Sequence, residues 1–350
     1  MRVVVTGNLG YVGTVLTPLL AAAGHEVWGL DSGFYEDCLL GPSGPSGVAR
    51  QHRTDLRAVT AAELDDAEAI VHLGALSNDP TGELNPGLTH DINTRASVRL
   101  AELAKGSGVR RFVFASSCSI YGASAGGQLD EDSAMNPLTA YARSKVDTEA
   151  ALLALADERF APTFLRNGTA YGFSPRLRVD IVVNNLVAWA VTTGKVTLQS
   201  DGRAWRPLVH VEDMGRAILA ALSVPVERVH RQALNIGREE DNWQIRAIAE
   251  AVARVVPGSA VTFAEGASAD SRNYNVSFAK VRRVLPEFVP RWSVEAGIRE
   301  LYEAFRGFAL DFERFEGREF TRLKQLLHLM RAGRLDADLL WIPTREEVSG

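Results

Sequence analysis

Three side chains near the middle of the chain have the types and the spacing needed for acid-base chemistry. Tyr141 and Lys145 are four residues apart in a segment expected to be helical, so they share one face of that helix. An unperturbed tyrosine has a pKa of ~10 and is a poor base at neutral pH, but a nearby ammonium group favours the phenolate and lowers that pKa. Ser117, at the end of a preceding strand, can hydrogen-bond the same substrate oxygen. The trio predicts proton transfer at a hydroxyl or carbonyl group; a surface Tyr and a surface Lys are the alternative.

The start of the sequence has the features of a dinucleotide-binding turn. Gly7, Gly10 and Gly13 follow the β-branched segment 2–6 and open an apolar helical pattern. Glycines here let the backbone approach a pyrophosphate, at which the helix N-terminus is aimed. Asp31 ends the next expected strand, where a carboxylate accepts hydrogen bonds from ribose hydroxyls and repels a 2′-phosphate. The pattern favours NAD over NADP; an ordinary tight turn and a solvated loop acid are the alternatives.

The elements that must position these residues alternate between strand and helix. Such alternation predicts an α/β fold with a doubly wound parallel sheet, which binds ligands beyond the carboxyl ends of its strands. Asp31, residues 75–79 and residues 116–119 all come at such ends, so we predict that they converge on one site. Strands are expected at 2–6, 25–30, 48–54, 69–75, 111–115 and 233–237, and helices at about 12–24, 91–106, 136–159 and 210–222.

The composition excludes several classes of function. The 350 residues suit two domains, and a formal charge of −5 provides no basic face for nucleic acid. The two cysteines, Cys38 and Cys118, form neither a metal-binding spacing nor a disulfide framework, which favours a reducing compartment. No segment reaches the ~18 apolar residues that would span a membrane, and the first strand leaves no room for a signal peptide. We therefore expect a cytoplasmic protein without a metal.

The chain resembles extended short-chain dehydrogenases/reductases of the nucleotide-sugar epimerase/dehydratase branch, the group that includes enzymes like UDP-galactose 4-epimerase. The motifs occur in consistent order over residues 1 to about 305. They are Thr6-Gly7-x-x-Gly10-x-x-Gly13, Asp31, Asp55-Leu56, His72-Leu73-Gly74-Ala75, Asn93, Ser116-Ser117…Tyr121-Gly122, Tyr141-x-x-x-Lys145, Leu165-Arg166…Tyr171-Gly172 and Arg206-Pro-Leu-Val209-His210-Val-Glu-Asp213.

The resemblance implies hydride transfer between a sugar carbon and NAD. In that chemistry Tyr141 takes the proton from a sugar hydroxyl, Lys145 holds the nicotinamide ribose and Ser117 orients the substrate oxygen. The expected NAD-binding residues are Gly7, Gly10, Tyr11, Val12, Gly13, Asp31, Asp55 (which otherwise caps a helix), Leu56, Leu73, Gly74, Ala75, Asn93, Tyr141 and Lys145. The expected substrate-binding residues are Ser77, Asn78, Ser117, Cys118, Ser119, Tyr141, Thr169, Asn185, Leu186, Arg206 and Arg272, the two arginines meeting the diphosphate unless they are exposed ion pairs.

Two departures from the family pattern narrow the reaction. Members that catalyse 4,6-dehydration have Asp-Glu where this chain has Cys118-Ser119, so 4,6-dehydration is disfavoured. Thr169 stands where an asparagine is usual. The hypothesis is an NAD-dependent epimerase of a nucleoside-diphosphate sugar that works through a keto-sugar intermediate. An NAD(P)H-dependent ketoreductase of an NDP-keto-sugar, an NDP-uronic acid decarboxylase and a non-catalytic NAD-binding regulator are the alternatives.

The expected domains are interleaved in the sequence. Residues 1–173, with a return segment at about 207–237, form the NAD-binding Rossmann domain, and 174–206 with 238–307 form a smaller domain for the nucleotide sugar. Residues 308–350 are a helical C-terminal extension, packed on the body or serving as a dimer contact or a lid. In it, the helix at 318–332 presents a stripe of Leu323, Leu326, Leu327 and Met330, and Arg318, Arg322, Lys324 and Arg331 form a solvated face. The resemblance implies a homodimer through the helices at about 91–106 and 138–156.

Overall fold

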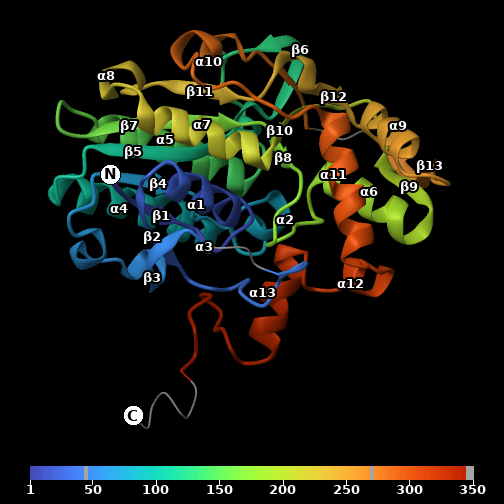
Figure 1. The fold of residues 1–350 in the computed structure, drawn as a ribbon, viewed down its shortest axis with the longest axis horizontal. Coiled ribbons are helices and arrows are strands. Elements are labelled where there is room, and N and C mark those ends of the chain that lie inside the picture. The colour runs from blue at the N-terminus through green and yellow to red at the C-terminus, as the bar shows by residue number, and fades with distance from the viewer. Residues whose placement is uncertain (43–45, 269–271, 344–350) are drawn as a thin grey trace.

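The computed structural model describes residues 1–42, 46–268 and 272–343. Residues 43–45, and residues 344–350 of the predicted extension, lie outside the described residues. At the centre is a sheet of seven strands, all parallel, in the order β11-β7-β5-β4-β1-β2-β3 (Figure 1). The predicted doubly wound α/β sheet is thereby confirmed. The strands are β1 (Arg2–Thr6), β2 (Glu26–Asp31), β3 (Val48–Arg53), β4 (Ala69–His72), β5 (Arg111–Ser117), β7 (Ala161–Asn167) and β11 (Ala233–Ile236).

Alternation along β1 explains why the sheet carries helices on both faces. Val3 and Val5 belong to one buried cluster and Val4 to another, since successive side chains of a strand point to opposite faces. Helices α1 (Gly13–Ala22) and α7 (Val211–Ser223) contribute to the cluster of Val3. Helices α4 (Ala96–Gly106) and α5 (Ala140–Leu155) cover the opposite face.

The predicted continuous helix 91–106 is interrupted. Residues Asp91–Arg95 form a π-helical turn, and α4 follows it. The widened turn holds Asn93, whose backbone carbonyl accepts hydrogen bonds from the hydroxyls of Ser97 (2.6 Å) and Thr148 (3.1 Å). Polar side chains thus hold the turn against α5. A sequence pattern of apolar residues cannot predict such a contact, because it is made by hydrogen bonds.

A second apolar core lies beside the carboxyl edge of the sheet. It is built by α6 (Val182–Thr193), α9 (Ile245–Val255), α11 (Val294–Gly307) and the parallel pair β9 (Lys195–Ser200) and β13 (Ala260–Ser268). Five further strands form two smaller sheets: in one, β8 and β10 pair in parallel and β10 and β12 antiparallel, and in the other β14 pairs in parallel with β6. The remaining bounds are β6 (Ala123–Leu129), β8 (Thr169–Tyr171), β10 (Trp205–His210), β12 (Asn242–Gln244), β14 (Asn273–Val276), α2 (Asp79–Gly82), α3 (Pro86–His90), α8 (Val226–Val229) and α10 (Ala279–Val284).

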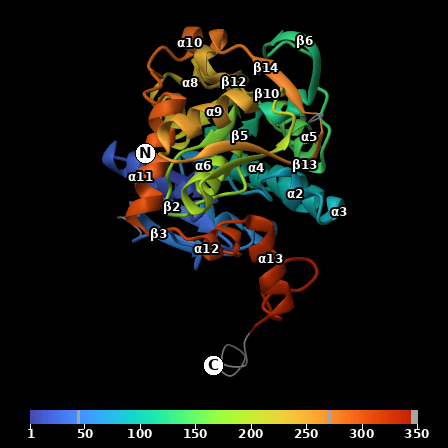
Figure 2. The ribbon, with the colours of Figure 1, turned by 90° about the vertical axis from the view of Figure 1, so that its right-hand side faces the viewer.

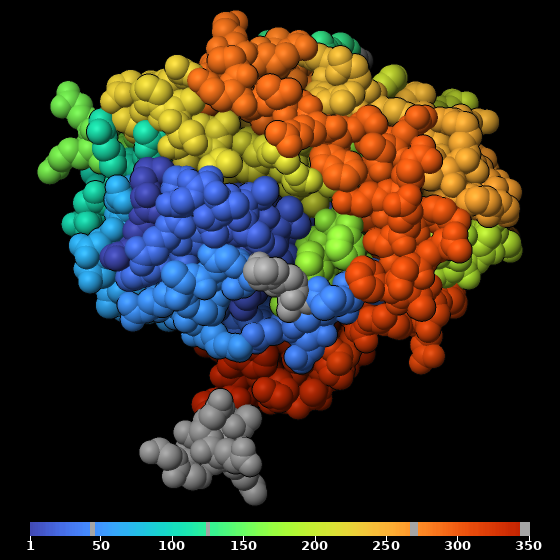
Figure 3. Space-filling view, viewed as in Figure 1, coloured from blue at the N-terminus to red at the C-terminus, as the bar shows by residue number. Residues whose placement is uncertain are grey.

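The C-terminal extension, described here for residues 308–343, is packed on the body through α12 (Phe312–Glu316) and α13 (Arg322–Arg331) (Figures 1 and 2). In the space-filling view its red surface lies along the lower edge of the molecule, against the first half of the chain (Figure 3). Leu326 and Leu329 join an apolar cluster with Phe34, Leu76 and residues of α3. The extension therefore contacts the segments that follow β2 and β4.

Two expectations for α13 are wrong. Leu326 is buried as expected, but Leu323, Leu327 and Met330 are only partly covered. Arg322 is not solvated: only 3% of it is exposed. The helix buries the face that carries positions 322, 325, 326 and 329, because Arg322 and Gln325 find buried polar partners, Gln325 donating to the carbonyl of Phe34 (3.1 Å). No helix in residues 1–42, 46–268 or 272–343 is long and apolar enough to cross a membrane.

Candidate active site

A cavity of about 820 Å³ lies over the carboxyl ends of the central strands. One wall is made by residues that follow β1, β2, β4 and β5, and the other by α6, β9 and β14. This is the edge at which open parallel sheets bind ligands. The predicted convergence holds: Asp31, residues 75–79 and Ser116, Ser117 and Ser119 all line this one cavity.

The glycine turn forms one end of the cavity. Gly7 has a φ of +72°, and a Cβ there would lie 2.8 Å from the amide nitrogen of Gly74. A Cβ on Gly13, where α1 begins, would lie 2.4 Å from Cα of Asn8. Val12, at the cap position, has no polar side chain to satisfy the first amides of α1. The backbone is thus drawn tightly together, and the start of α1 lines the cavity.

Asp31 lines the cavity at the end of β2. Its carboxylate accepts hydrogen bonds from the amides of Leu9 (3.1 Å) and Gly33 (2.8 Å), which fix its position beside the glycine turn. Burial raises the pKa of Asp31, and these two amides oppose that effect. Asp55 lines the cavity too, and it also caps the short helix Leu56–Ala58 and forms an ion pair with Arg57 (2.8 Å). Both interpretations offered for Asp55 thus remain compatible with its position.

The acid-base trio meets at the middle of the cavity. Tyr141 and Lys145 come from the first turns of α5 and Ser117 from the last position of β5. The Lys145 ammonium donates to the carbonyl of Ala115 (2.8 Å) and lies 5.6 Å from the Tyr141 ring centroid. Lys145 is 4% exposed, so the alternative of a surface lysine is excluded.

Burial, and not Lys145, dominates the electrostatics of Tyr141. It raises the pKa of Tyr141 to about 12, against the smaller effects of the Arg178 charge and the Ser117 hydroxyl. Burial also lowers the pKa of Lys145 to about 8. The expectation that Lys145 lowers the pKa of Tyr141 is therefore not met in this structure. Burial destabilises the charged phenolate more strongly than the surrounding charges and hydrogen bonds stabilise it.

A buried ion pair holds α5 against the sheet. Glu149, one turn after Lys145, pairs with Arg166 of β7 at 2.8 Å, and both side chains are less than 10% exposed. The Ser116 hydroxyl donates to the same carboxylate, and the guanidinium of Arg166 also donates to the hydroxyl of Tyr121 (3.1 Å). Lys145 is thus placed by a fully bonded network.

Two predicted site residues are not among the described residues that line the cavity. Asn93 is buried, and its amide bonds the backbone of Leu76 on both sides, accepting from the nitrogen (2.8 Å) and donating to the oxygen (3.1 Å). Cys118 is buried as well, and its thiol donates to the carbonyl of Arg166. In this structure neither side chain borders the cavity, because the η4 turn (Cys118–Tyr121) points Cys118 into the sheet core and the amide of Asn93 is held by Leu76.

The other predicted substrate residues border the cavity beyond the trio. Arg206 is 6% exposed, so it is not an exposed ion pair. Arg272 forms an ion pair with Asp79 (2.7 Å) and also lines the cavity, so both interpretations of Arg272 remain open. Arg206 also lies 5.5 Å from the ring centroid of Tyr274. The predicted substrate residues that line this part are Ser77, Asn78, Ser119, Thr169, Asn185, Leu186, Arg206 and Arg272.

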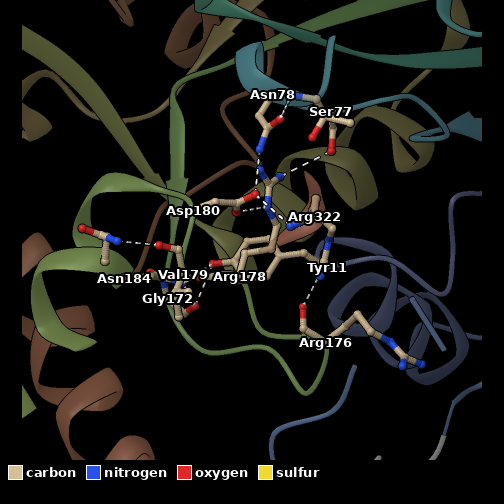
Figure 4. Close-up of polar contacts among 12 residues, drawn as sticks. Tyr11, Ser77, Asn78, Gly172, Arg176, Arg178, Val179, Asp180, Asn184 and Arg322 are labelled. Atoms are coloured by element: carbon tan, nitrogen blue, oxygen red, sulfur yellow. Dashed lines mark hydrogen bonds and ion pairs between the residues drawn. The ribbon is translucent and has the colours of Figure 1, made fainter. Parts of the chain in front are cut away.

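Sequence reasoning missed a charged cluster on the wall nearest the extension. Arg178, Asp180 and Arg322 line the cavity and bond one another or Ser77 and Asn78 (Figure 4). The segment Arg178-Val179-Asp180 could have been noticed, because two opposite charges one residue apart follow a family motif. For Arg322 the sequence carried no such signal.

Comparison with known proteins shows which family the chain belongs to. Residues 3–237 match the model of the NAD dependent epimerase/dehydratase family. The chain belongs to this family. The predicted resemblance and NAD as the family cofactor are thereby confirmed, and the tight glycine turn, Asp31 and the cavity between them fit such a dinucleotide.

The relatives differ in the reaction they catalyse. The chain is 30% identical to a probable UDP-glucuronate 4-epimerase of Rhizobium meliloti (67% of this chain, 71% of the relative). It is 25% identical to UDP-glucuronic acid decarboxylase 1 of Arabidopsis thaliana (91% and 72%). The solved structure of MoeE5 in complex with UDP-glucuronic acid and NAD is 27% identical, with a TM-score of 0.75 (88% of this chain, 99% of that one). Membership of the family thus leaves the individual reaction open.

Proposed function

We propose that the protein is an NAD-dependent epimerase of a nucleoside-diphosphate sugar. The observation that carries the proposal is that Ser117, Tyr141 and Lys145 line the same cavity as the glycine turn and Arg206. Where 4,6-dehydratases of the family carry two acids, this chain has Cys118 in the core and Ser119 at the cavity. An acid-base trio without those acids suits oxidation and reduction of one carbinol.

In this mechanism Tyr141 takes the proton from the sugar hydroxyl and later returns it, while Ser117 holds the same oxygen. A bound NAD would supply the hydride acceptor for the sugar carbon and, once reduced, the hydride donor for the return step. Since Tyr141 keeps its proton at neutral pH in the structure as it stands, positive charge near its hydroxyl must rise when the ligands bind. Lys145, whose ammonium now donates to Ala115, is the group that would turn to the cofactor ribose.

The nucleotide end of the substrate would lie against α6 and β10. Asn185 and Leu186 would contact the nucleotide, and Arg206 and Arg272 would meet the diphosphate, for which a guanidinium offers two parallel donors. UDP-sugars bound by relatives such as MoeE5 support a nucleotide sugar as the ligand class.

We also propose a division of labour between the two parts of the chain: residues 1–173 and about 207–237 bind NAD, and residues 174–206 and 238–307 bind the substrate. We further propose that the protein is a cytoplasmic homodimer that associates through the outer faces of α4 and α5.

The test is to identify what the protein carries and converts. Ligands released by denaturing the purified protein would be identified by mass spectrometry, and UDP-sugars would then be followed by NMR with catalytic NAD. Interconversion of two epimers without net use of NAD supports the proposal. Stoichiometric consumption of reduced cofactor with a keto-sugar would replace it by the ketoreductase, and release of CO₂ from UDP-glucuronate by the decarboxylase that a relative represents.

Replacing Asp31 by Ala should weaken NAD binding by about 10- to 100-fold and bring NADP to comparable affinity, because the ribose loses its acceptor and the 2′-phosphate its repulsion. Titration calorimetry with both cofactors measures this. The exposed Asp37, changed to Ala, is the matched control. If Asp31→Ala stays folded and both affinities are unchanged, the ribose assignment is wrong.

The lowered pKa of Lys145 predicts a pH dependence. With a pKa of about 8 the ammonium is present at pH 7 and is lost as the pH rises through 8. Any NAD affinity that depends on its charge should therefore be full below pH 8, and we expect a fall of about tenfold by pH 9.5. Calorimetry across this range tests it, with Lys145→Met expected to bind weakly and without that dependence. A flat profile in the unaltered protein would contradict the assignment.

A further inference from the structure

The C-terminal extension places a buried arginine in the wall of the ligand cavity. Arg322, the first residue of α13, is 3% exposed and lines the cavity. Its guanidinium donates to the carbonyl of Arg176 (2.9 Å) and its Cζ lies 4.4 Å from the ring centroid of Tyr35. These contacts fix the position of the Arg322 cation. They join it to a segment that lies more than 140 residues earlier in the sequence.

A second buried arginine lies beside it, on the segment between β8 and α6 (Figure 4). Arg178 is 9% exposed; its Nε pairs with Asp180 at 2.7 Å and its Nη1 lies 3.4 Å from the hydroxyl of Ser77. The other oxygen of Asp180 accepts from the side chain of Asn78 (2.6 Å) and from the backbone nitrogen of Arg322 (3.3 Å). One carboxylate thus serves both arginines.

Not every buried guanidinium nitrogen in this wall has a hydrogen-bond acceptor among the described residues. Two guanidinium groups face one carboxylate, Asp180. Nη2 of Arg178 and Nη1 of Arg322 are buried and have no hydrogen-bond partner among the described residues. A buried donor left unpaired is destabilising, and more so when it is charged, so two in one wall favour a ligand that accepts their hydrogen bonds. Burial lowers the pKa of Arg322 to about 10, which leaves it charged at neutral pH.

The two nitrogens belong to the same cavity as the acid-base trio. Ser77 and Asn78, which touch the cluster, follow β4 directly and line the cavity with Tyr141. The charge of Arg178 is felt at Tyr141, where it lowers the pKa against the effect of burial. The cluster also adjoins Tyr11 of the glycine turn, whose pKa both arginines lower against burial. An anion held there would lie between the trio and the turn.

We propose that Arg322 and Arg178 together bind an oxyanion of a ligand in this cavity, so that the C-terminal extension is part of the binding site. Paired guanidinium groups suit a carboxylate or a phosphate, each of which accepts several hydrogen bonds. Two ligands of the proposed function carry such a group: a hexuronate sugar, in its carboxylate, and NAD, in its diphosphate. The proposal rests on the proposed function for the identity of these ligands.

The test compares Arg322→Gln with Arg331→Gln, an exposed arginine at the other end of the same helix. Calorimetry would measure NAD, and then UDP-glucuronate and UDP-glucose in the presence of NAD, on a Tyr141→Phe background that cannot turn over. We expect Arg322→Gln to weaken either NAD, or UDP-glucuronate without UDP-glucose, by tenfold or more, and Arg331→Gln to change none of the three by more than twofold. Thermal unfolding establishes that each variant is folded.

The pattern of losses identifies the anion. Weaker NAD binding assigns the site to the cofactor diphosphate, and a loss for UDP-glucuronate that spares UDP-glucose assigns it to a sugar carboxylate. Unchanged affinities, or an equal loss for the two UDP-sugars with NAD unaffected, would overturn the proposal. If the glutamine variant does not fold, Arg322→Lys keeps the buried charge but not the planar fork; its affinities should fall at least threefold, and values within twofold would overturn the proposal equally. No readout needs turnover, so a missing epimerase activity would count against the proposed function alone.

Discussion

Tyr141→Phe is expected to lower the turnover number by about a thousandfold or more while the protein still binds NAD. The substitution removes only the hydroxyl that exchanges a proton with the sugar, and positioned acid-base catalysis contributes ~10²–10⁴-fold. The ring, packed at the start of α5, is retained. Turnover would be measured by NMR on the converting UDP-sugar, and bound NAD by mass spectrometry.

Tyr302→Phe is the matched control, since Tyr302 lies on α11 and bonds only the surface residue Arg306 among its described partners. It should keep full activity. A Tyr141→Phe rate within tenfold of the unaltered protein would show that another group moves the proton, and the assigned mechanism would have to be abandoned.

Glu149→Ala is expected to cost about 3–5 kcal/mol of the free energy of unfolding. The carboxylate is the buried counter-charge of Arg166, and removing one partner of a buried pair leaves an uncompensated charge in the core. It also removes the acceptor of the Ser116 hydroxyl. Urea unfolding followed by circular dichroism measures the loss.

Glu303→Ala, at an exposed position of α11 outside the proposed dimer contact, should change the stability by less than about 0.5 kcal/mol. A variant at Glu149 that stays folded should also lose activity, because the pair holds α5 and with it Lys145. A loss of stability no larger than that of the Glu303 variant would mean that Arg166 finds other partners, and that the network does not place α5.

Much of the site could be predicted because its residues lie close to strand ends. Gly7, Asp31 and Ser117 each follow or end a β-branched or apolar strand, and a parallel sheet brings all such ends to one edge. Tyr141 and Lys145 share a face through helical spacing alone. In these cases a local pattern and one topological rule determine the position.

The rest depended on contacts between distant parts of the chain. Arg322 is buried because Arg176 and Asp180, far earlier in sequence, accept its hydrogen bonds. Cys118 turns into the core and Asn93 bonds the backbone of Leu76, although motif position suggested ligand contacts for both. The raised pKa of Tyr141 follows from burial, which a spacing of four residues does not report.

The path of the chain between the two cores has a consequence for engineering. The chain runs from the sheet to α6, returns through β10 to α7 and β11, and leaves again through β12 to α9. The substrate side cannot be exchanged between relatives as one cassette, because every graft would need several junctions inside paired strands. The extension is different: residues 308–343 leave the body once, after α11, yet bring Arg322 to the cavity. A single junction there would exchange the part of the cavity wall that carries Arg322 and, under the proposal above, the ligand anion that it binds.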